Sequence, residues 1–182
     1  RIAKYTFVRE NTSIKTGSLA VPRLKGGIQY IDTKSKYDYG VSGWQTAIHR
    51  GDVLHSLGYT GKGIVIAQLD AGYYHVDSLT AFSSLWLNNQ ILGTRDFVEP
   101  GNNVFNSHTH GMVVLSIMAG NLPGELIGSA PDASFWLLRT EDTRSEYPIE
   151  GDNWTSGAEF ADSAGADVIN TSLGYSTFQD ST

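Results

Sequence analysis

Short apolar runs recur along the chain and predict the strands of a buried sheet. The three expected strands are residues 64–69, 134–138 and 167–172. They are rich in β-branched or aromatic residues, and the first is nearly all apolar, which is typical of a strand that is buried on both faces of a parallel sheet. Because the first run ends at Asp70, we expect a carboxylate at the carboxyl end of a core strand.

Helical patterns separate these runs. The segments 110–119 and 149–164 predict two helices, and each is followed by a glycine that can end a helix. Apolar residues near helical spacing between Gly40 and Gly58 predict one or two more short helices. The alternation of strand and helix indicates an α/β fold with a mostly parallel sheet, in which ligands gather beyond the carboxyl ends of the strands.

The first part of the chain shows no such pattern. Residues 1–39 mix charged residues and glycines with short alternating apolar positions, and no period is sustained there. We interpret residues 1–39 as a lead-in or a propeptide remnant. The chain has 182 residues, 40% of them hydrophobic, which suffices for one domain with a sizeable core.

Charge and composition exclude several classes of partner and chemistry. The net charge is −6, and no run of lysine or arginine could neutralise several phosphates, so nucleic acid is not expected as a partner. No apolar stretch reaches the roughly 18 to 20 residues that span a membrane, and a signal-peptide pattern is absent, so we expect a soluble, processed chain. The chain has no cysteine, which excludes disulfides, thiolate catalysis and cysteine-bound zinc.

Two ionisable side chains stand where a strand ends and where a helix begins. Asp70 follows the first apolar run and precedes the small residues Ala71 and Gly72. Taken alone, this aspartate could simply cap a turn. His110 opens a helix that is apolar on nearly every side and is therefore expected to be buried, and it too could be a satisfied structural residue.

Five landmarks follow one another along the chain: the approach segment 58–63, Asp70-x-Gly72, His110-Gly111-x-x-Val114, Ala130-Pro131 and the segment 167–174. In their order and context, these motifs resemble the subtilase family of serine proteases, peptidase family S8. The resemblance covers roughly residues 40–177. Two features depart from the family pattern: Met112 replaces the usual threonine, and the 40-position interval from Asp70 to His110 exceeds that of the shortest members. We expect residues 79–89 to hold the extra length as surface structure.

The resemblance implies a subtilisin-like three-layer fold that is incomplete in this chain, with residues 40–182 as the N-terminal half of the catalytic domain. It implies peptide-bond hydrolysis by a serine endopeptidase in which Asp70 orients His110 and His110 acts as general base toward a serine. Ser172, Leu173 and Gly174 resemble the segment that lines the pocket for the substrate residue before the cleaved bond, although Leu173 could equally be core packing. Residues 144–147 form either a second edge for an extended peptide or a solvated loop.

The serine itself is not found, because the sequence has no segment similar to Gly-Thr-Ser-Met-Ala. We expect the nucleophile in a missing or separate segment, this chain alone to be inactive, and the C-terminal remainder of the same protease to be its partner, besides protein or peptide substrates. No cofactor is required. A structural calcium ion stays open, although residues 121–126 depart from the asparagine-rich calcium loop of the family. The family-level expectation for localisation is secreted or periplasmic.

Three other interpretations of these residues are possible. A metal-dependent hydrolase could use His108 and His110, with Asp70, His75 and Asp77 nearby. However, a His-x-His pair shares one face only in a strand, and the residues after His110 favour a helix. In a nucleotide site the glycines would follow a strand, whereas those of segment 58–63 precede one. The third reading is a catalytically inactive subtilase fragment that binds peptides.

Overall fold

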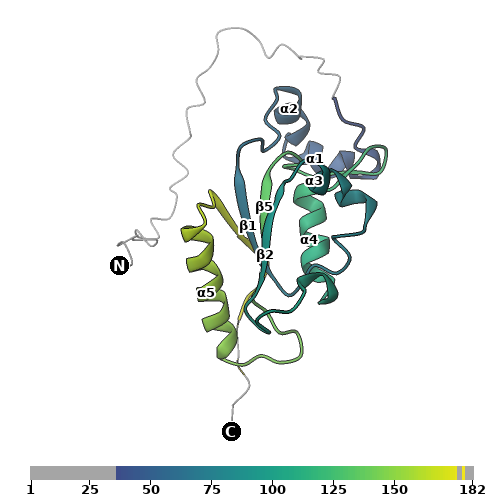
Figure 1. The fold of residues 1–182 in the computed structure, drawn as a ribbon. Coiled ribbons are helices and arrows are strands. Elements are labelled where there is room, and N and C mark those ends of the chain that lie inside the picture. Colours follow the sequence, from purple (N-terminus) through teal and green to yellow (C-terminus); the bar gives the residue numbers. More distant parts are fainter. Residues whose placement is uncertain (1–35, 176–177, 179–182) are drawn as a thin grey trace, which may run out of the picture. The chain divides into compact units, whose positions relative to one another are not determined.

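The computed structural model describes residues 36–175 and 178, so the lead-in before residue 36 lies outside the described residues. The core is a four-stranded parallel sheet in the order β2-β5-β1-β6. Its strands are β1 (Val65–Asp70), β2 (Ile91–Asp96), β5 (Ser134–Arg139) and β6 (Val168–Thr171). The predicted α/β fold with a parallel sheet is confirmed (Figure 1).

Four of the described helices lie where the sequence pattern predicted them, whereas α3 was not predicted. They are α1 (Gly43–Ile48), α2 (Gly51–Ser56), α3 (Ser83–Leu87), α4 (His110–Ala119) and α5 (Ile149–Ser163), with short 3-10 turns at Gly40–Ser42, Thr80–Phe82 and Val104–Asn106. Helix α4 has the predicted bounds, and Gly165 has a positive φ of 77° just beyond α5, which suits a glycine that ends a helix. The two-stranded hairpin β3 (Asn121–Leu122) and β4 (Leu126–Ile127) follows α4.

Helices α4 and α5 cover opposite faces of the sheet, which makes the described part three layers thick (Figure 1). The pleat of β1 explains this arrangement, since successive side chains point to opposite faces. Ile66 packs in the cluster that includes Leu115 of α4, whereas Ala67 and Leu69 pack in the cluster that includes Ala161 of α5. A strand that is apolar at nearly every position is therefore buried on both faces, as the sequence predicted.

Three expectations about this core are wrong in detail. Helix α4 is not buried all round, because Val113 is 50% exposed and Ile117 is 60% exposed. β6 is not a core strand of this chain but an edge strand, and both Val168 and Ile169 are exposed. The segment 79–89 is not only surface structure, because it contributes buried side chains to the core on the α4 face.

Strand β2 had no counterpart among the predicted strands. Its sequence, Ile-Leu-Gly-Thr-Arg-Asp, lacks both a continuous apolar run and a strict alternation. It joins the sheet beside β5, with a shift in register between Ile91 and Gly93. A Cβ at Gly93 would lie 2.3 Å from the Trp136 ring, so this glycine gives the indole of β5 its space.

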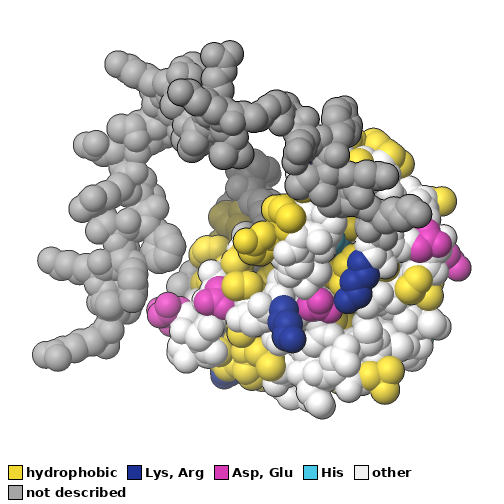
Figure 2. Space-filling model, turned by 90° about the horizontal axis from the view of Figure 1, so that it is seen from above, with side chains coloured by type: hydrophobic (Ala, Val, Ile, Leu, Met, Phe, Trp, Pro, Cys, Tyr) yellow, Lys and Arg dark blue, Asp and Glu magenta, His cyan; other side chains and the backbone are white. Residues whose placement is uncertain are grey.

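The end of the fold with α1 and α2 exposes many hydrophobic side chains, which Figure 2 shows from above among separated charged groups. The exposed hydrophobic residues of this segment are Val41, Trp44, Ile48, Leu54, Leu57 and Tyr59. Tyr39 and His55 anchor the segment, because the phenol and the imidazole Nδ1 are 2.8 Å apart and His55 Nε2 bonds the Ser129 carbonyl at 2.9 Å. No helix in the described part of the chain is long and apolar enough to span a membrane.

Candidate active site

Asp70 is the last residue of β1, at the carboxyl edge of the sheet, and its side chain is fully buried. Its carboxylate accepts two short hydrogen bonds at Oδ1, from the Ala71 backbone at 2.7 Å and from His110 Nδ1 at 2.7 Å. Gln68 Nε2 donates to Oδ2 at 3.2 Å. A buried carboxylate held by three donors has a fixed orientation, and its negative charge is compensated by these hydrogen bonds.

His110 is the first residue of α4, and the strand and the helix meet at its ring. With Nδ1 bonded to Asp70, the carboxylate selects the tautomer that carries its proton on Nδ1 and leaves Nε2 free to accept one. The His110 side chain is 44% exposed, and no group of residues 36–175 and 178 forms a hydrogen bond with Nε2. The arrangement is a half-exposed base whose other nitrogen is bound to a buried acid.

Gly111 lets the helix approach the strand this closely. A Cβ at position 111 would lie 2.4 Å from the Gly72 carbonyl oxygen and 2.9 Å from Asp70 Cβ. Gln68 Nε2 also donates to the Gly111 carbonyl at 2.9 Å, so the same amide side chain binds both the carboxylate and the start of α4. The His-Gly pair is thus a geometric requirement for bringing the imidazole to the carboxylate.

The loop before α4 is fastened to the turn after β1. Tyr73 N donates to the Val104 carbonyl at 2.9 Å, and Tyr74 N donates to the His108 carbonyl at 3.2 Å. At Gly72, whose φ is +148°, a Cβ would lie 2.4 Å from His108 N, so only glycine fits between the two segments. These contacts fix where the chain enters α4.

Tyr73 supports the pair from within the core. Its buried hydroxyl donates to the Gln68 carbonyl at 2.6 Å and accepts from Leu138 N at 3.2 Å, which links β1 to β5. Burial, together with the nearby charge of Asp70, holds the pKa of the Tyr73 phenol well above its usual value, so the phenol stays protonated and donates.

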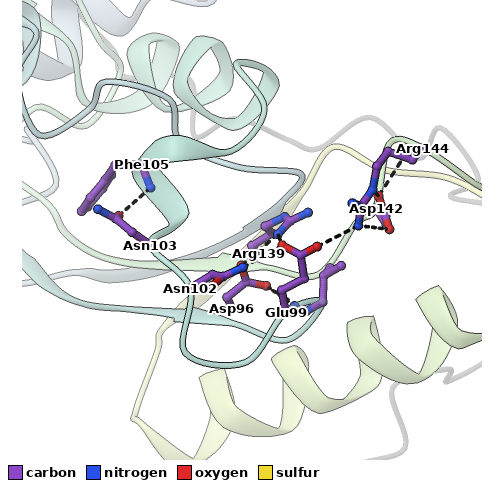
Figure 3. Close-up of polar contacts among 9 residues, drawn as sticks. Asp96, Glu99, Asn102, Asn103, Phe105, Arg139, Asp142 and Arg144 are labelled. Carbon is purple, nitrogen blue, oxygen red and sulfur yellow. Dashed lines mark hydrogen bonds and ion pairs between the residues drawn. The ribbon is translucent and has the colours of Figure 1, made fainter.

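An open depression of about 220 Å³ lies beside the pair at the carboxyl edge. Its lining residues are Ala71, Glu99, Asn106, Ser107, His108, Arg139, Asp142, Thr143 and Arg144. Arg139, at the end of β5, bonds Asp96 at 2.9 Å and Glu99 at 3.3 Å, and Arg144 bonds Glu99 at 2.9 Å and Asp142 at 2.7 Å (Figure 3). This network joins the loops that follow β2 and β5.

This charged network was not predicted from the sequence, because β2 was not predicted. Asp96 and Arg139 each end a strand, and their strands are neighbours in register, with Asp96 opposite Arg139. Recognition of β2 would have placed both charges at the edge where Asp70 lies. Hydrogen bonds from Arg144 hold the pKa values of the Glu99 and Asp142 carboxyls below their usual range, so both stay ionised.

The predicted substrate segment Ser172–Gly174 directly follows β6 at the same edge, since Thr171 pairs with Leu69 in the register of β1 and β6. Ser172 and Gly174 are exposed and Leu173 is half-buried, so Leu173 is neither full core packing nor a fully open wall. Residues 144–147 are not a strand here; they lie in the irregular loop that precedes α5.

The structure does not bring together the residues that a metal-dependent hydrolase would use as ligands. His110 Nδ1 is engaged by Asp70, and His108 Nδ1 lies 3.2 Å from the His110 backbone N–H, which donates to it. Within the described ranges, the three-residue group that meets the spacing of metal ligands lies elsewhere, at Glu141, Glu146 and Glu150. Residues 121–126 fold as the β3–β4 hairpin with Glu125 as their one acidic residue, which does not fit a calcium loop.

Comparison with known proteins gives the family. The Subtilase family matches residues 61–182, about two thirds of the chain. This chain belongs to the subtilase family. The resemblance inferred from Asp70, His110 and their surroundings is thereby confirmed.

Two curated relatives come from Bacillus subtilis (strain 168). The minor extracellular protease Vpr is 36% identical over 124 residues, which are 66% of this chain and 15% of that protein. Subtilisin E is 33% identical over 131 residues, which are 70% of this chain and 31% of that protein. The chain therefore spans less than a third of the length of these two relatives.

Solved structures of subtilisin-like proteases share the fold. MycP1 with its N-terminal propeptide removed matches with a TM-score of 0.55 at 21% identity, over 70% of this chain and 36% of that chain. MycP1 from Mycobacterium smegmatis matches with a TM-score of 0.52 at 19% identity, over 74% and 36%. At these identities the likeness concerns the fold.

Proposed function

We propose that this chain supplies the aspartate and the histidine of the Asp-His-Ser triad of a subtilisin-like serine endopeptidase. The observation that carries the proposal is the 2.7 Å contact between the buried Asp70 carboxylate and Nδ1 of the half-exposed His110. Membership of the subtilase family supports it. The substrates are proteins or peptides.

The chemistry follows from this geometry. A serine hydroxyl is a poor nucleophile at neutral pH, so a base must take its proton during attack on the peptide carbonyl. His110 Nε2 takes that proton, and the imidazolium then returns it to the leaving amine. Asp70 holds the ring in the required tautomer and stabilises the imidazolium through the Nδ1 hydrogen bond. These side chains need no cofactor.

Substrate binding is proposed at the carboxyl edge of the sheet. Ser172, Leu173 and Gly174 form one wall of the pocket for the residue before the cleaved bond. Their place directly after β6, at the edge where Asp70 ends β1, supports this role. Backbone groups of an exposed segment next to a strand can pair with an extended peptide.

The nucleophile is proposed to lie on the C-terminal remainder of the same protease, and this chain alone is proposed to be inactive. The exposed apolar side chains Val113 and Ile117 on α4 and Val168 and Ile169 on β6 support a partner that covers them. The exposed edge of β6 would also pair with a further strand. By analogy with the extracellular protease Vpr, we propose that the complete protease is secreted or periplasmic.

The test starts from the protein purified from its natural source. Intact masses under native and denaturing conditions show whether a second polypeptide accompanies this chain, and a fluorophosphonate probe labels an activated serine. We expect labelling on a segment outside these 182 residues. Replacing His110 by alanine should slow labelling by at least about 1,000-fold, because the serine loses its base.

The matched control is His49→Ala, which removes an exposed histidine at the end of α1 and should leave labelling unchanged. A protein that takes no label would be an inactive, peptide-binding relative, and the proposal would be wrong. Inhibition by a chelator but not by the probe would instead favour the metal-dependent hydrolase.

A further inference from the structure

Three glutamates outside the candidate triad converge where β5 passes into α5. Glu141 lies just after β5, Glu146 in the following loop and Glu150 in the first turn of α5. One carboxylate oxygen from each lies within 4.8 Å of the others. None of the ion pairs found within residues 36–175 and 178 involves these glutamates, so no arginine or lysine neutralises them there.

Burial makes this cluster unusual. Glu150 is 0% exposed and Glu141 is 8% exposed, whereas Glu146 is exposed. Glu150 Oε1 accepts from Tyr147 N at 3.2 Å, but Oε2 is buried and has no hydrogen-bond partner. A buried carboxylate oxygen without a donor is costly, and beside two further carboxylates it is stabilised either by a bound cation or by a proton shared between the carboxyls.

A hydroxyl from the segment that follows β6 completes the surroundings. Tyr175, four residues after the end of β6, donates to Glu141 Oε2 at 3.0 Å. This bond orients the Glu141 carboxylate toward the cluster and links it to the segment that contains Ser172–Gly174. Burial of the phenol, with the neighbouring carboxylates, raises the pKa of Tyr175, so the hydroxyl keeps its proton and donates.

We propose that Glu141, Glu146 and Glu150 bind a hard divalent cation of the size of Ca²⁺, which fastens the loop between β5 and α5. Calcium takes carboxylate oxygens at about 2.3 to 2.6 Å, so two opposed ligand oxygens lie roughly 4.6 to 5.2 Å apart. The three carboxylate oxygens all lie within 4.8 Å of one another, close enough to share one such ion. Magnesium requires about 2.0 to 2.1 Å and near-octahedral geometry, which draws opposed oxygens closer.

The burial of Glu150 also favours a small ion over the other candidate cation, which is a basic side chain of a bound peptide. A guanidinium or an ammonium group on a peptide would have to reach Glu150 through a surface at which that residue has no exposed area. A bare ion needs only the exposed Glu146 carboxylate as its entry point. The loop that these ligands hold contains residues 144–147, next to the depression beside His110.

The test uses the complete protease that contains this chain, as the wild-type protein, as Glu150→Gln and as the control Glu159→Gln. All three are stripped of metal by a chelator at about pH 8. Glu159 is an exposed carboxylate on the same helix. We expect Ca²⁺ to raise the midpoint of thermal unfolding of the wild-type and control proteins, and Mg²⁺ to raise it less. Glu150→Gln should weaken Ca²⁺ binding at least tenfold by calorimetry, without lowering the metal-free midpoint, because it removes a buried negative charge.

A second variant and a second readout keep the test decisive. Glu146→Gln changes an exposed side chain, so it should fold and should also weaken Ca²⁺ binding. Bound Tb³⁺ should luminesce through energy transfer from nearby aromatic side chains such as Tyr175, and the signal should fall in Glu146→Gln. An identical response of the wild-type protein and both cluster variants to Ca²⁺ would refute the site. Two further results would also overturn it: no response to Ca²⁺ in the wild-type protein, which would leave a shared proton, or a changed preference for basic substrates without Ca²⁺ binding.

Discussion

Replacing Gly111 by alanine should pull His110 away from Asp70. The new Cβ would lie 2.4 Å from the Gly72 carbonyl oxygen, 2.9 Å from Asp70 Cβ and 3.0 Å from Tyr73 Cε1. None of these neighbours is the far end of a flexible side chain. Asp70 and Tyr73 are buried, and Gly72 is itself pressed against His108, so the first turn of α4 must move instead.

The size of that movement sets the expected effect. Real Cβ contacts do not fall below 3.0 Å, so the contact of 2.4 Å must lengthen by about 0.6 Å or more. A misplacement of about 1 Å in a catalytic group can cost roughly 100-fold in rate. Overpacking of a tight core costs about 1 to 3 kcal/mol, or roughly 2 to 12 °C in Tm for a protein of this size. We therefore expect a fall of one to two orders of magnitude in kcat/KM with a modest loss of stability.

The assay measures kcat/KM on a peptide substrate and Tm for the complete protease that contains this chain. The control is Gly151→Ala, in the first turn of α5, where an added Cβ meets nothing within 4 Å. Alanine there should keep activity and stabilise slightly, because glycine is a poor helix former. A Gly111→Ala protein with normal kcat/KM and Tm would refute the claim that this glycine sets the distance between Asp70 and His110.

Two further changes test the supports of the site. Arg139→Met should lower the free energy of unfolding by about 3 kcal/mol, because it leaves the buried Asp96 carboxylate without its cation. The control Arg144→Gln removes an exposed partner, so thermal unfolding should show a far smaller change. Equal changes in the two variants would contradict the reasoning. Tyr73→Phe should cost about 1 to 3 kcal/mol for the lost hydroxyl bridge. Since the folded-state pKa of Tyr73 lies above that of the unfolded chain, its protonated form stabilises the fold below about pH 10, and this contribution is lost as the pH rises further. The free energy of unfolding, measured between about pH 8 and 11, should fall less steeply with pH in Tyr73→Phe than in the wild-type protein. Identical slopes would show that Tyr73 does not cause the loss of stability at high pH.

The sequence was most informative where one physical requirement dominates a segment. Strand β1 is buried on both faces, so nearly every position is apolar and its end at Asp70 is marked by a charge. Helix α4 begins at His110 and stops before Gly120, and both limits were predictable from the apolar stretch between them. The Asp70 and His110 side chains could therefore be located before their distance was known.

Strands and surfaces that depend on neighbours were harder to predict. Strand β2 mixes polar and apolar residues, and it becomes a strand because its backbone pairs with β5 and Gly93 accommodates a tryptophan ring. The glutamate cluster joins residues 141, 146 and 150 through the loop before α5, and no spacing rule for strands or helices brings them together. Such features follow from tertiary contacts, which single-sequence periodicity does not contain.

Within the described part of the chain, the hydrogen bonds that orient Asp70 and the start of α4 come from residues between Gln68 and Gly111. The carboxylate is oriented by its own strand and turn, and the helix start is held by Gln68 and by the close fit of Gly111. A second segment that brings the serine would therefore meet a base that is already aligned. It would have to supply the nucleophile and the oxyanion donors but would not have to build the acid–base pair. For this reason the Gly111→Ala change should impair even a protease whose serine segment is intact.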